Sequence, residues 1–264
     1  GAETIEYQLH SNDGWKPDFS DIAEKMDDSV RLLVLINPNN PCGTVCGADD
    51  IDALLEIARR YPNCIVVADE IYDGLDFTGE HVSVASRSED VPVVALNGVS
   101  KVYYAPGWRI GYMALHDPTK RMGLVRDGLE RLLRSRLCAS TPAQVGYLAG
   151  LEHDRGWMET YSERVLRRRD HCLKRIAQID GLEVEQPGGA FYMFVRLTDE
   201  RWANDDKAFV LQLLHEEHVL LVHGSGFSPQ LGKGHVRLVY LVTLEVLDEV
   251  FDRIERFLKK HRGH

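Results

Sequence analysis

The sequence of 264 residues lacks any apolar run that approaches the roughly 20 residues needed to cross a membrane. Its first ten residues, GAETIEYQLH, have neither the basic start nor the apolar core of a signal peptide. Basic residues are in the minority, and the formal net charge of -10 argues against a nucleic-acid-binding surface, which would appear as a basic patch. We find no internal repeat and no low-complexity segment. The sequence therefore predicts a globular protein of one or two domains, with neither membrane nor nucleic acid as a partner.

Cysteine is scarce, and its five positions form an odd, scattered set: Cys42, Cys46, Cys64, Cys138 and Cys172. Such a set favours free thiols in a reducing compartment, so we expect a cytoplasmic location. Cys42 and Cys46 have no second pair beside them, and structural zinc sites use four ligands. We therefore predict no metal site.

The first half of the chain alternates between strand and helix patterns. The stretch VRLLVLI, residues 30–36, is a continuous apolar run, which is typical of a strand buried on both faces. We predict a helix with one apolar face at residues 48–60. Further strands are expected at residues 64–69, 91–97 and 109–115. This succession predicts an α/β layered domain with a mostly parallel sheet.

The pattern changes in the second half of the chain. Helices are predicted at residues 120–136, 142–151 and 157–179, and the last of these is long and highly charged. Strands of a second sheet are then expected at residues 190–197, 219–224 and 235–241, with helices at residues 206–217 and 244–260. We therefore predict a large domain over residues 1–154 and a smaller C-terminal domain over residues 155–264.

Unusual polar residues follow three of the predicted strands of the first domain. The stretches are NPNNPCGT (37–44), ADEIYDG (68–74) and LNGVSKVYYAPGWRIG (96–111). Each alone has an ordinary explanation, because Asn-Pro pairs make turns, acidic residues cap helices and lone lysines lie on surfaces. In open α/β sheets, however, ligands bind beyond the carboxyl ends of the strands. Together these stretches would bring an amide, a carboxylate, a phenol, an amine and a guanidinium to one cleft.

That set of groups suits the chemistry of pyridoxal phosphate. The amine of Lys101 could form an imine with an aldehyde cofactor, provided that burial or neighbours lower its pKa. Asp69 could pair with a protonated ring nitrogen, whose charge drains electrons from the substrate Cα. Arg109 could bind a phosphate through two N–H groups. Tyr72 and Asn40 could hydrogen-bond the phenolic oxygen of the ring.

These residues resemble those of the class I/II aminotransferases, which are pyridoxal-phosphate enzymes of fold type I. The matching segments are NPNNPCGT, ADEIYDG, NGVSKVYYAPGWRIGY, PGGAFYMFVRL and HVRLVYL, and they come in the family's order. The resemblance runs from about Trp15 to the C-terminus. It implies an α/β fold with a three-layer α/β/α large domain, incomplete here, and a smaller α+β C-terminal domain. Within the family, NGVSKVYYAPGWRIGYM, VLLVHGSGF and HVRLVYL look similar to alanine-type enzymes.

The resemblance implies a role for each matching residue. Lys101 corresponds to the catalytic lysine, which forms a Schiff base with the cofactor and carries the substrate Cα proton. Arg237 corresponds to the arginine that binds the substrate α-carboxylate, with Asn40 beside it. Ser100 and Arg109 correspond to phosphate-binding residues. The full set implied for cofactor binding is Asn40, Asp69, Tyr72, Ser100, Lys101 and Arg109.

The proline-rich turn has a purpose in this interpretation. Pro38 and Pro41 restrict the backbone on either side of Asn40, so the turn can hold its amide at the cofactor. We expect Asn37 and Asn39 to brace the turn itself.

The activity implied by the resemblance is transfer of an amino group between an L-amino acid and a 2-oxo acid, by a homodimer. Alanine with 2-oxoglutarate is the preferred pair, and aspartate, aromatic or methionine donors are alternatives. A pyridoxal-phosphate lyase acting on carbon–sulfur bonds would share the cofactor residues. A third hypothesis is a non-catalytic ligand-binding module, as in transcription regulators that look like aminotransferases, but no winged-helix segment or basic arm is present.

A typical chain of the family is about half as long again, and its N-terminal part supplies a helix start that binds the phosphate. That part also carries an aromatic residue that stacks on the ring and segments that line the substrate pocket. We therefore expect this sequence to be a fragment without its N-terminal part, with full activity doubtful for the chain alone.

Overall fold

The computed structural model of the chain describes residues 1–153 and 156–262. The chain divides into two compact units. Unit 1 comprises Gly1–Tyr7, Pro17–Pro38 and Val45–Glu159, and unit 2 comprises Gln8–Lys16, Asn39–Thr44 and Thr160–His264. The domain boundary predicted between residues 154 and 155 lies outside the described residues, so it stays a prediction.

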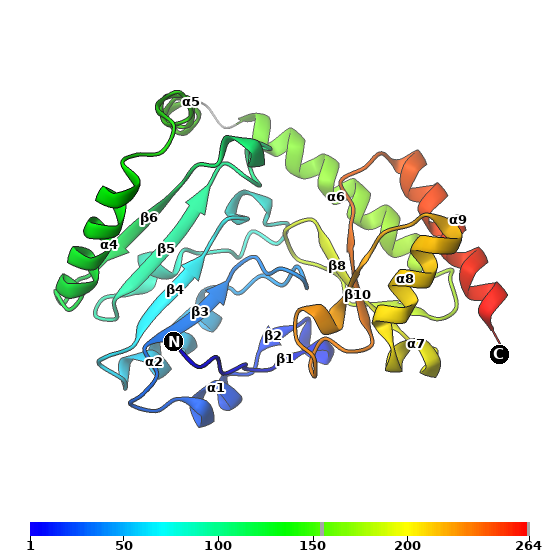
Figure 1. Cartoon of the computed structure of the whole chain (residues 1–264), viewed down its shortest axis with the longest axis horizontal. Helices are drawn as coiled ribbons and strands as arrows, with labels where there is room; N and C mark the ends of the chain where they lie inside the picture. The colour runs from blue at the N-terminus through cyan, green and yellow to red at the C-terminus, as the bar shows by residue number, and fades with distance from the viewer. Residues whose placement is uncertain (154–155, 263–264) are drawn as a thin grey trace. The chain divides into compact units, whose positions relative to one another are not determined.

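Unit 1 is built on a four-stranded sheet in the order β3-β4-β5-β6 (Figure 1). The first three strands are parallel, and the fourth runs antiparallel to its neighbour, as the prediction of a mostly parallel sheet requires. The strands are β3 (Leu32–Ile36), β4 (Ile65–Asp69), β5 (Val93–Gly98) and β6 (Gly111–His116). The α-helices are α1 (Phe19–Lys25), α2 (Ala48–Arg59), α3 (Val84–Arg87), α4 (Gly123–Arg136) and α5 (Thr141–Glu152), and short 3-10 helices are η2 (Asp73–Leu75) and η3 (Pro106–Trp108).

One apolar face of α2 forms the core of unit 1, as its sequence period predicts. Ile51, Leu54 and Leu55 are at most 2% exposed, and they pack in one cluster with Leu33 and Leu35 of β3. Burial of such side chains contributes roughly 1.5–3 kcal/mol each. The helix is thereby fixed against the sheet that carries Asp69.

The prediction that the first strand is buried on both faces is wrong. Leu32 is 56% exposed and Val34 is 47% exposed, while Leu33 and Leu35 are buried. The physical reason is that β3 is the edge strand of the described sheet, and α2 covers only one of its faces. An apolar run predicts a strand, but the exposure of its side chains depends on what lies on each face.

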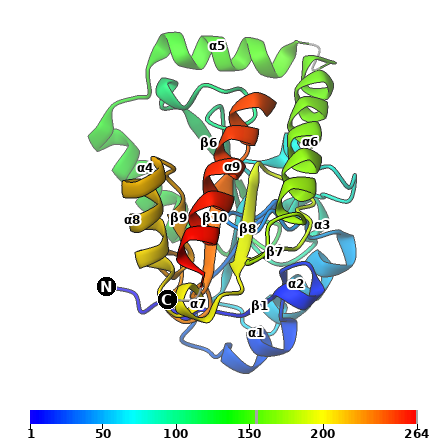
Figure 2. The same ribbon diagram turned by 90° about the vertical axis from the view of Figure 1, so that its right-hand side faces the viewer.

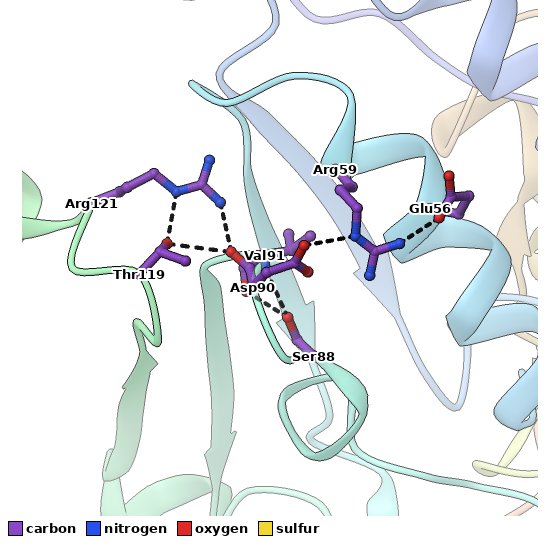
Figure 3. Close-up of polar contacts among 7 residues, drawn as sticks. All are labelled: Glu56, Arg59, Ser88, Asp90, Val91, Thr119 and Arg121. Carbon is purple, nitrogen blue, oxygen red and sulfur yellow. Dashed lines mark hydrogen bonds and ion pairs between the residues drawn. The ribbon is translucent and has the colours of Figure 1, made fainter.

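Polar contacts fix the amino end of β5, opposite to the end that leads to Lys101 (Figure 3). The carboxylate of Asp90 accepts a hydrogen bond from Arg59 Nε at 2.8 Å, and this bond holds the pKa of Asp90 below its ordinary value. The backbone carbonyl of Asp90 accepts from Arg121 Nη2 at 2.6 Å and from Thr119 Oγ1 at 3.3 Å. These contacts tie the end of α2 and the segment after β6 to the start of β5.

Unit 2 contains an antiparallel sheet in the order β7-β8-β10-β9. Figure 2 shows α8 and α9 beside this sheet, and α8 packs against α9, β9 and β10. The strands are β7 (Leu182–Val184), β8 (Tyr192–Leu197), β9 (Val222–His223) and β10 (His235–Val239), with the short β1 (Leu9–His10) and β2 (Lys16–Pro17) near the N-terminus. The helices are α6 (Gly156–Ile176), which enters from unit 1, α7 (Glu200–Asn204), α8 (Asp206–Glu217) and α9 (Leu244–His261), with η1 (Ser11–Asp13) and η4 (Gly224–Gly226).

Aromatic side chains of α7, α8 and α9 pack together in the core of unit 2. Trp202, Phe209 and Phe257 are at most 2% exposed, and their ring centroids lie 5.5–5.6 Å apart. Edge and tilted ring contacts of this kind add to the free energy of area burial. Across the described residues, we find no helix with the length and apolar character needed for a membrane span.

The asparagines of the NPNNPCGT turn brace it as predicted. The side chain of Asn37, which is 1% exposed, donates to the Cys46 carbonyl and accepts from the Cys46 amide, both at 2.9 Å. Asn39 Oδ1 accepts from the Cys42 amide at 3.2 Å. The amide side chains therefore replace backbone partners where the chain leaves β3.

We expect Asn37→Ala to lower the free energy of unfolding by about 2–4 kcal/mol, because two buried backbone groups of Cys46 lose their partner. Urea unfolding followed by circular dichroism would measure this loss. The matched control is Asn63→Ala, which changes an exposed asparagine of unit 1 and should stay within about 0.5 kcal/mol of the parent. Equal stabilities of the two variants would contradict the bracing role.

Candidate functional site

Asp69 ends β4 in unit 1, beside the carboxyl end of the parallel strand β5. Its carboxylate is half-buried, and Oδ1 accepts a hydrogen bond from the Ile71 amide at 3.2 Å. Burial raises the pKa of Asp69 above its ordinary value, while the Ile71 amide and the charge of Lys101 act in the opposite direction. The ionised carboxylate is therefore in an environment that favours a cationic partner.

Lys101 lies in the turn that follows β5. Its two flanking valines, Val99 and Val102, are each 2% exposed and anchor the turn in the core. The Nζ atom lies 5.9 Å from the centroid of the buried Tyr72 ring and within electrostatic reach of Asp69. Unit 1 thus brings together an amine, a phenol and a carboxylate from two neighbouring strand ends.

The two predicted phosphate-binding residues lie on the same segment of the chain. Ser100 precedes Lys101 and is partly buried. Arg109 is exposed and follows η3, with a left-handed φ of 53°. Its Nη1 donates to the Pro106 carbonyl at 2.7 Å, which fixes one side of the guanidinium against its own turn.

The remaining two predicted site residues, Asn40 and Arg237, lie together in unit 2. Arg237, on β10, donates from Nη1 to Asn40 Oδ1 at 2.8 Å. The family resemblance implies that both bind the substrate carboxylate, although they are 197 residues apart. The guanidinium also lies 4.6 Å from the ring centroid of Tyr192 and 5.0 Å from that of Phe227.

The loop that carries Asn40 is packed tightly within unit 2. The Gly43 amide donates to the Asn39 carbonyl at 3.0 Å, and the Asn39 amide donates to the Thr44 carbonyl at 2.8 Å. Gly43 has a φ of 72°, and a Cβ at this position would lie 2.5 Å from the Pro187 side chain. Only glycine suits this position, because both the left-handed backbone and the close approach exclude a side chain.

Two residues beside Arg237 in unit 2, Tyr192 and Phe227, were not predicted from the sequence. The antiparallel register places Tyr192 opposite Val239, two residues from Arg237 and therefore on the same face of the sheet. The alternation of side chains along the strands could therefore have identified Tyr192 as a neighbour of Arg237. Phe227 follows the turn η4, so its contact with Arg237 depends on tertiary packing and leaves no periodic signal. Among the described residues, no group of three or more His, Cys, Asp or Glu side chains is arranged to hold a metal ion.

The groups within unit 1 suit a ligand with charges of both signs, and those within unit 2 suit an anion. Unit 1 offers a carboxylate for a cation, with cationic side chains on the neighbouring segment, and unit 2 offers a guanidinium beside an amide. Guanidinium groups bind carboxylates through paired hydrogen bonds, and serine and arginine side chains suit a phosphate. These are the groups that a phosphorylated cofactor and an amino acid would require.

Comparison with known proteins gives consistent matches over nearly the whole chain. The sequence model of the family described as "Aminotransferase class I and II" matches residues 1–254. A glutamate-pyruvate aminotransferase of Haemophilus influenzae is 35% identical over 99% of this chain and 65% of its own length. An alanine aminotransferase of Mycobacterium tuberculosis is 32% identical over 99% of this chain and 62% of its own length.

The fold agrees with that of solved structures. An alanine aminotransferase from Pyrococcus furiosus is 43% identical and superposes with a TM-score of 0.94, over 98% of this chain and 65% of its own. This likeness confirms the predicted pyridoxal-phosphate-enzyme fold of type I. The chain spans about 62–65% of the length of the relatives described above.

We expect Asp69→Asn to stabilise the cofactor-free chain at neutral pH. A carboxyl group whose pKa is raised by folding binds its proton more tightly in the folded state, so its ionised form opposes folding. This opposition is complete above the raised pKa and vanishes below the pKa of the unfolded chain. The gain in thermal midpoint of the variant should therefore shrink as the pH falls through the pKa of Asp69.

The control for this measurement is Asp28→Asn, which changes an exposed carboxylate of unit 1. Thermal unfolding would be followed between pH 8 and the acid limit of folding. A stability gain of Asp69→Asn that is independent of pH, or equal to that of the control, would contradict the burial of an ionised carboxylate at position 69.

Proposed function

Because this chain belongs to the class I and II aminotransferase family, we propose that it transfers an amino group between an L-amino acid and a 2-oxo acid. Alanine and 2-oxoglutarate are the proposed pair, supported by the names of the relatives at 32–35% identity. Family membership implies pyridoxal phosphate as the cofactor. The observation that carries the proposal is the half-buried carboxylate of Asp69 within electrostatic reach of the Lys101 amine, at the ends of adjacent parallel strands.

The residues of unit 1 fit this cofactor. Asp69 is a carboxylate whose burial favours a cationic partner, and a protonated pyridine nitrogen is such a partner. Lys101 supplies the primary amine that would bind the cofactor covalently. Ser100 and Arg109 supply a hydroxyl and a guanidinium for the phosphate. When bound, pyridoxal phosphate supplies a positively charged ring that withdraws electrons from the substrate Cα.

The side chains of the protein have the remaining roles in the proposed reaction. Asp69 would keep a proton on the ring nitrogen, and Tyr72 and Asn40 would donate hydrogen bonds to the phenolic oxygen. Lys101 Nζ would take up the Cα proton of the amino donor and later return it. Arg237 would bind the α-carboxylate of each substrate, which both the amino acid and the 2-oxo acid possess.

The orphaned donor of Arg237 supports this substrate role. Its Nε atom is buried and has no hydrogen-bond partner among the described residues. A buried guanidinium donor without a partner costs free energy, so a ligand carboxylate near this group would be stabilising. Aspartate and aromatic amino acids are the alternative donors, because they carry the same α-carboxylate.

We also propose a homodimer in the cytoplasm. The helix α4, all of which the structure describes, contains no buried residue. Leu124 and Leu137 are each 88% exposed, and Leu132 and Leu133 are more than 60% exposed. Apolar surface of this kind supports a protein–protein interface.

The cofactor proposal is tested by Lys101→Ala. After addition of pyridoxal phosphate and reduction with borohydride, the parent chain should carry a covalent adduct on the peptide that contains Lys101, detected by mass spectrometry. The variant should lack the adduct and the accompanying absorbance near the visible edge. A control variant, Lys207→Ala, changes an exposed lysine of α8 and should retain both signals. An adduct located on another lysine would refute the assignment.

The reaction itself is tested by a single turnover with alanine. An aminotransferase should release no more than one equivalent of pyruvate per bound cofactor until 2-oxoglutarate is added, and then form pyruvate and glutamate in equal amounts. A carbon–sulfur lyase would instead release repeated equivalents of pyruvate and ammonia from cysteine without an acceptor. Ammonia release of that kind would replace the proposed function with the lyase.

A further inference from the structure

The guanidinium of Arg237 is covered by aromatic rings within unit 2. The rings of Tyr192 and Phe227 lie 4.6 and 5.0 Å from its central carbon, and Asn40 accepts its Nη1 hydrogen at 2.8 Å. Such rings attract a cation, and they also exclude water from it. A charge pair is stronger where water is excluded, because the effective dielectric constant is lower. The cover therefore prepares Arg237 to bind an anion.

The two rings are held in different ways. Tyr192 is 4% exposed and lies in β8, in register with β10. Phe227 is 37% exposed and lies outside the sheet, directly after the turn η4. Its amide donates to the Gly224 carbonyl at 2.9 Å. The position of the Phe227 ring therefore depends on what holds this turn.

The turn η4 is held by contacts with the core of unit 2. The Ser225 amide donates to Asp206 Oδ2 at 2.7 Å, and Ser225 Oγ lies 3.0 Å from His223 Nδ1. Gly224 approaches its neighbours so closely that a Cβ there would lie 2.1 Å from the Gly232 carbonyl oxygen. Two hydrogen bonds and close backbone packing therefore fix the turn that leads to Phe227.

Asp206 is the unusual member of this set, because it is a carboxylate that is only 2% exposed. It lies in the first turn of α8, where the helix dipole stabilises negative charge. Buried charges are found where hydrogen bonds compensate them, and the Ser225 amide is such a partner. Asp206 therefore connects a core helix of unit 2 to the turn that carries Phe227.

We propose that Asp206 is a positioning residue, which holds Phe227 over Arg237 through the Ser225 amide and thereby raises the affinity of Arg237 for carboxylates. The substrates concerned are α-carboxylates, so this role rests on the proposed function of Arg237. Asp206 and Phe227 touch neither the reacting atoms nor the cofactor in this scheme. Their effect is on carboxylate binding alone.

The test uses the full chain without cofactor, with propionate as the probe, because propionate has a carboxylate but no reactive amine or ketone. Arginine labelled with nitrogen-15 would report the Nε–H signal of each guanidinium, and Arg237→Lys identifies the signal of Arg237 by its loss. In the parent chain, propionate should shift this signal in a saturable manner. Phe227→Ala should weaken the affinity by roughly 5- to 30-fold, because water admitted to the guanidinium raises the effective dielectric constant and weakens its attraction for the carboxylate.

Matched variants separate positioning from general damage. Asp206→Asn keeps an oxygen that can accept from the Ser225 amide, so its affinity should stay within about threefold of the parent. Asp206→Ala should resemble Phe227→Ala. Leu231→Ala changes an exposed side chain of the neighbouring loop and should have no effect.

The proposal is overturned if propionate leaves the Arg237 signal unchanged, or if Phe227→Ala binds propionate as tightly as the parent. Loss of affinity in Asp206→Asn equal to that in Asp206→Ala would also overturn the proposed hydrogen-bond role. Failure of Asp206→Ala to fold leaves Phe227→Ala and Asp206→Asn to decide. These outcomes are independent of the alanine turnover assay, which decides the proposed function by itself.

Discussion

A carboxylate that is partly withdrawn from water needs a cation nearby, and this constraint organises the candidate site of unit 1. Burial raises the pKa of Asp69, and the charge of Lys101 offsets part of that effect. The two groups come within electrostatic reach because β4 and β5 are parallel and in register, with Asp69 opposite Leu96. Since the carboxyl ends of parallel strands lie at one edge of a sheet, residues 32 positions apart along the chain reach one place.

In unit 2 the same constraint applies to a positive charge, which needs an anion nearby. The guanidinium of Arg237 is partly withdrawn from water beneath Tyr192 and Phe227, and the oxygen of Asn40 compensates one of its N–H groups. An amide oxygen is neutral, so the positive charge itself keeps its attraction for an anion. Each unit, taken by itself, thus contains a half-buried charge whose natural complement is a ligand group of opposite sign.

Much of the fold follows from periodicity. The helix predicted at residues 206–217 is α8 with its observed bounds, and most of the apolar residues that recur at helical spacing in α9 are buried, although Leu244 at its start is exposed. The short elements α1, α3, α7 and β7 were not predicted, because elements this short leave too few repeats to establish a period. The exposure of β3 was not predicted either. The spacing of apolar residues shows which side chains are apolar, but it does not show which of them other elements cover. For the same reason Phe227 and Asp206 could not be related to Arg237 in advance, because their contacts join separate elements of the fold.

The adjacent carboxylates Asp69 and Glu70 have different partners in the structure, although the sequence motif does not distinguish their roles. Successive side chains of a strand point to opposite sides, so neighbours in sequence enter different surroundings. Glu70 is 7% exposed and accepts a hydrogen bond from the Val84 amide at 2.9 Å, at the start of α3. Glu70 therefore caps a helix, which is the ordinary role that the sequence alone would allow for either residue. Asp69 instead lies at the strand end, where it accepts from the Ile71 amide and has the charge of Lys101 within electrostatic reach. This difference in surroundings separates the residue that braces the fold from the one that we propose for the cofactor.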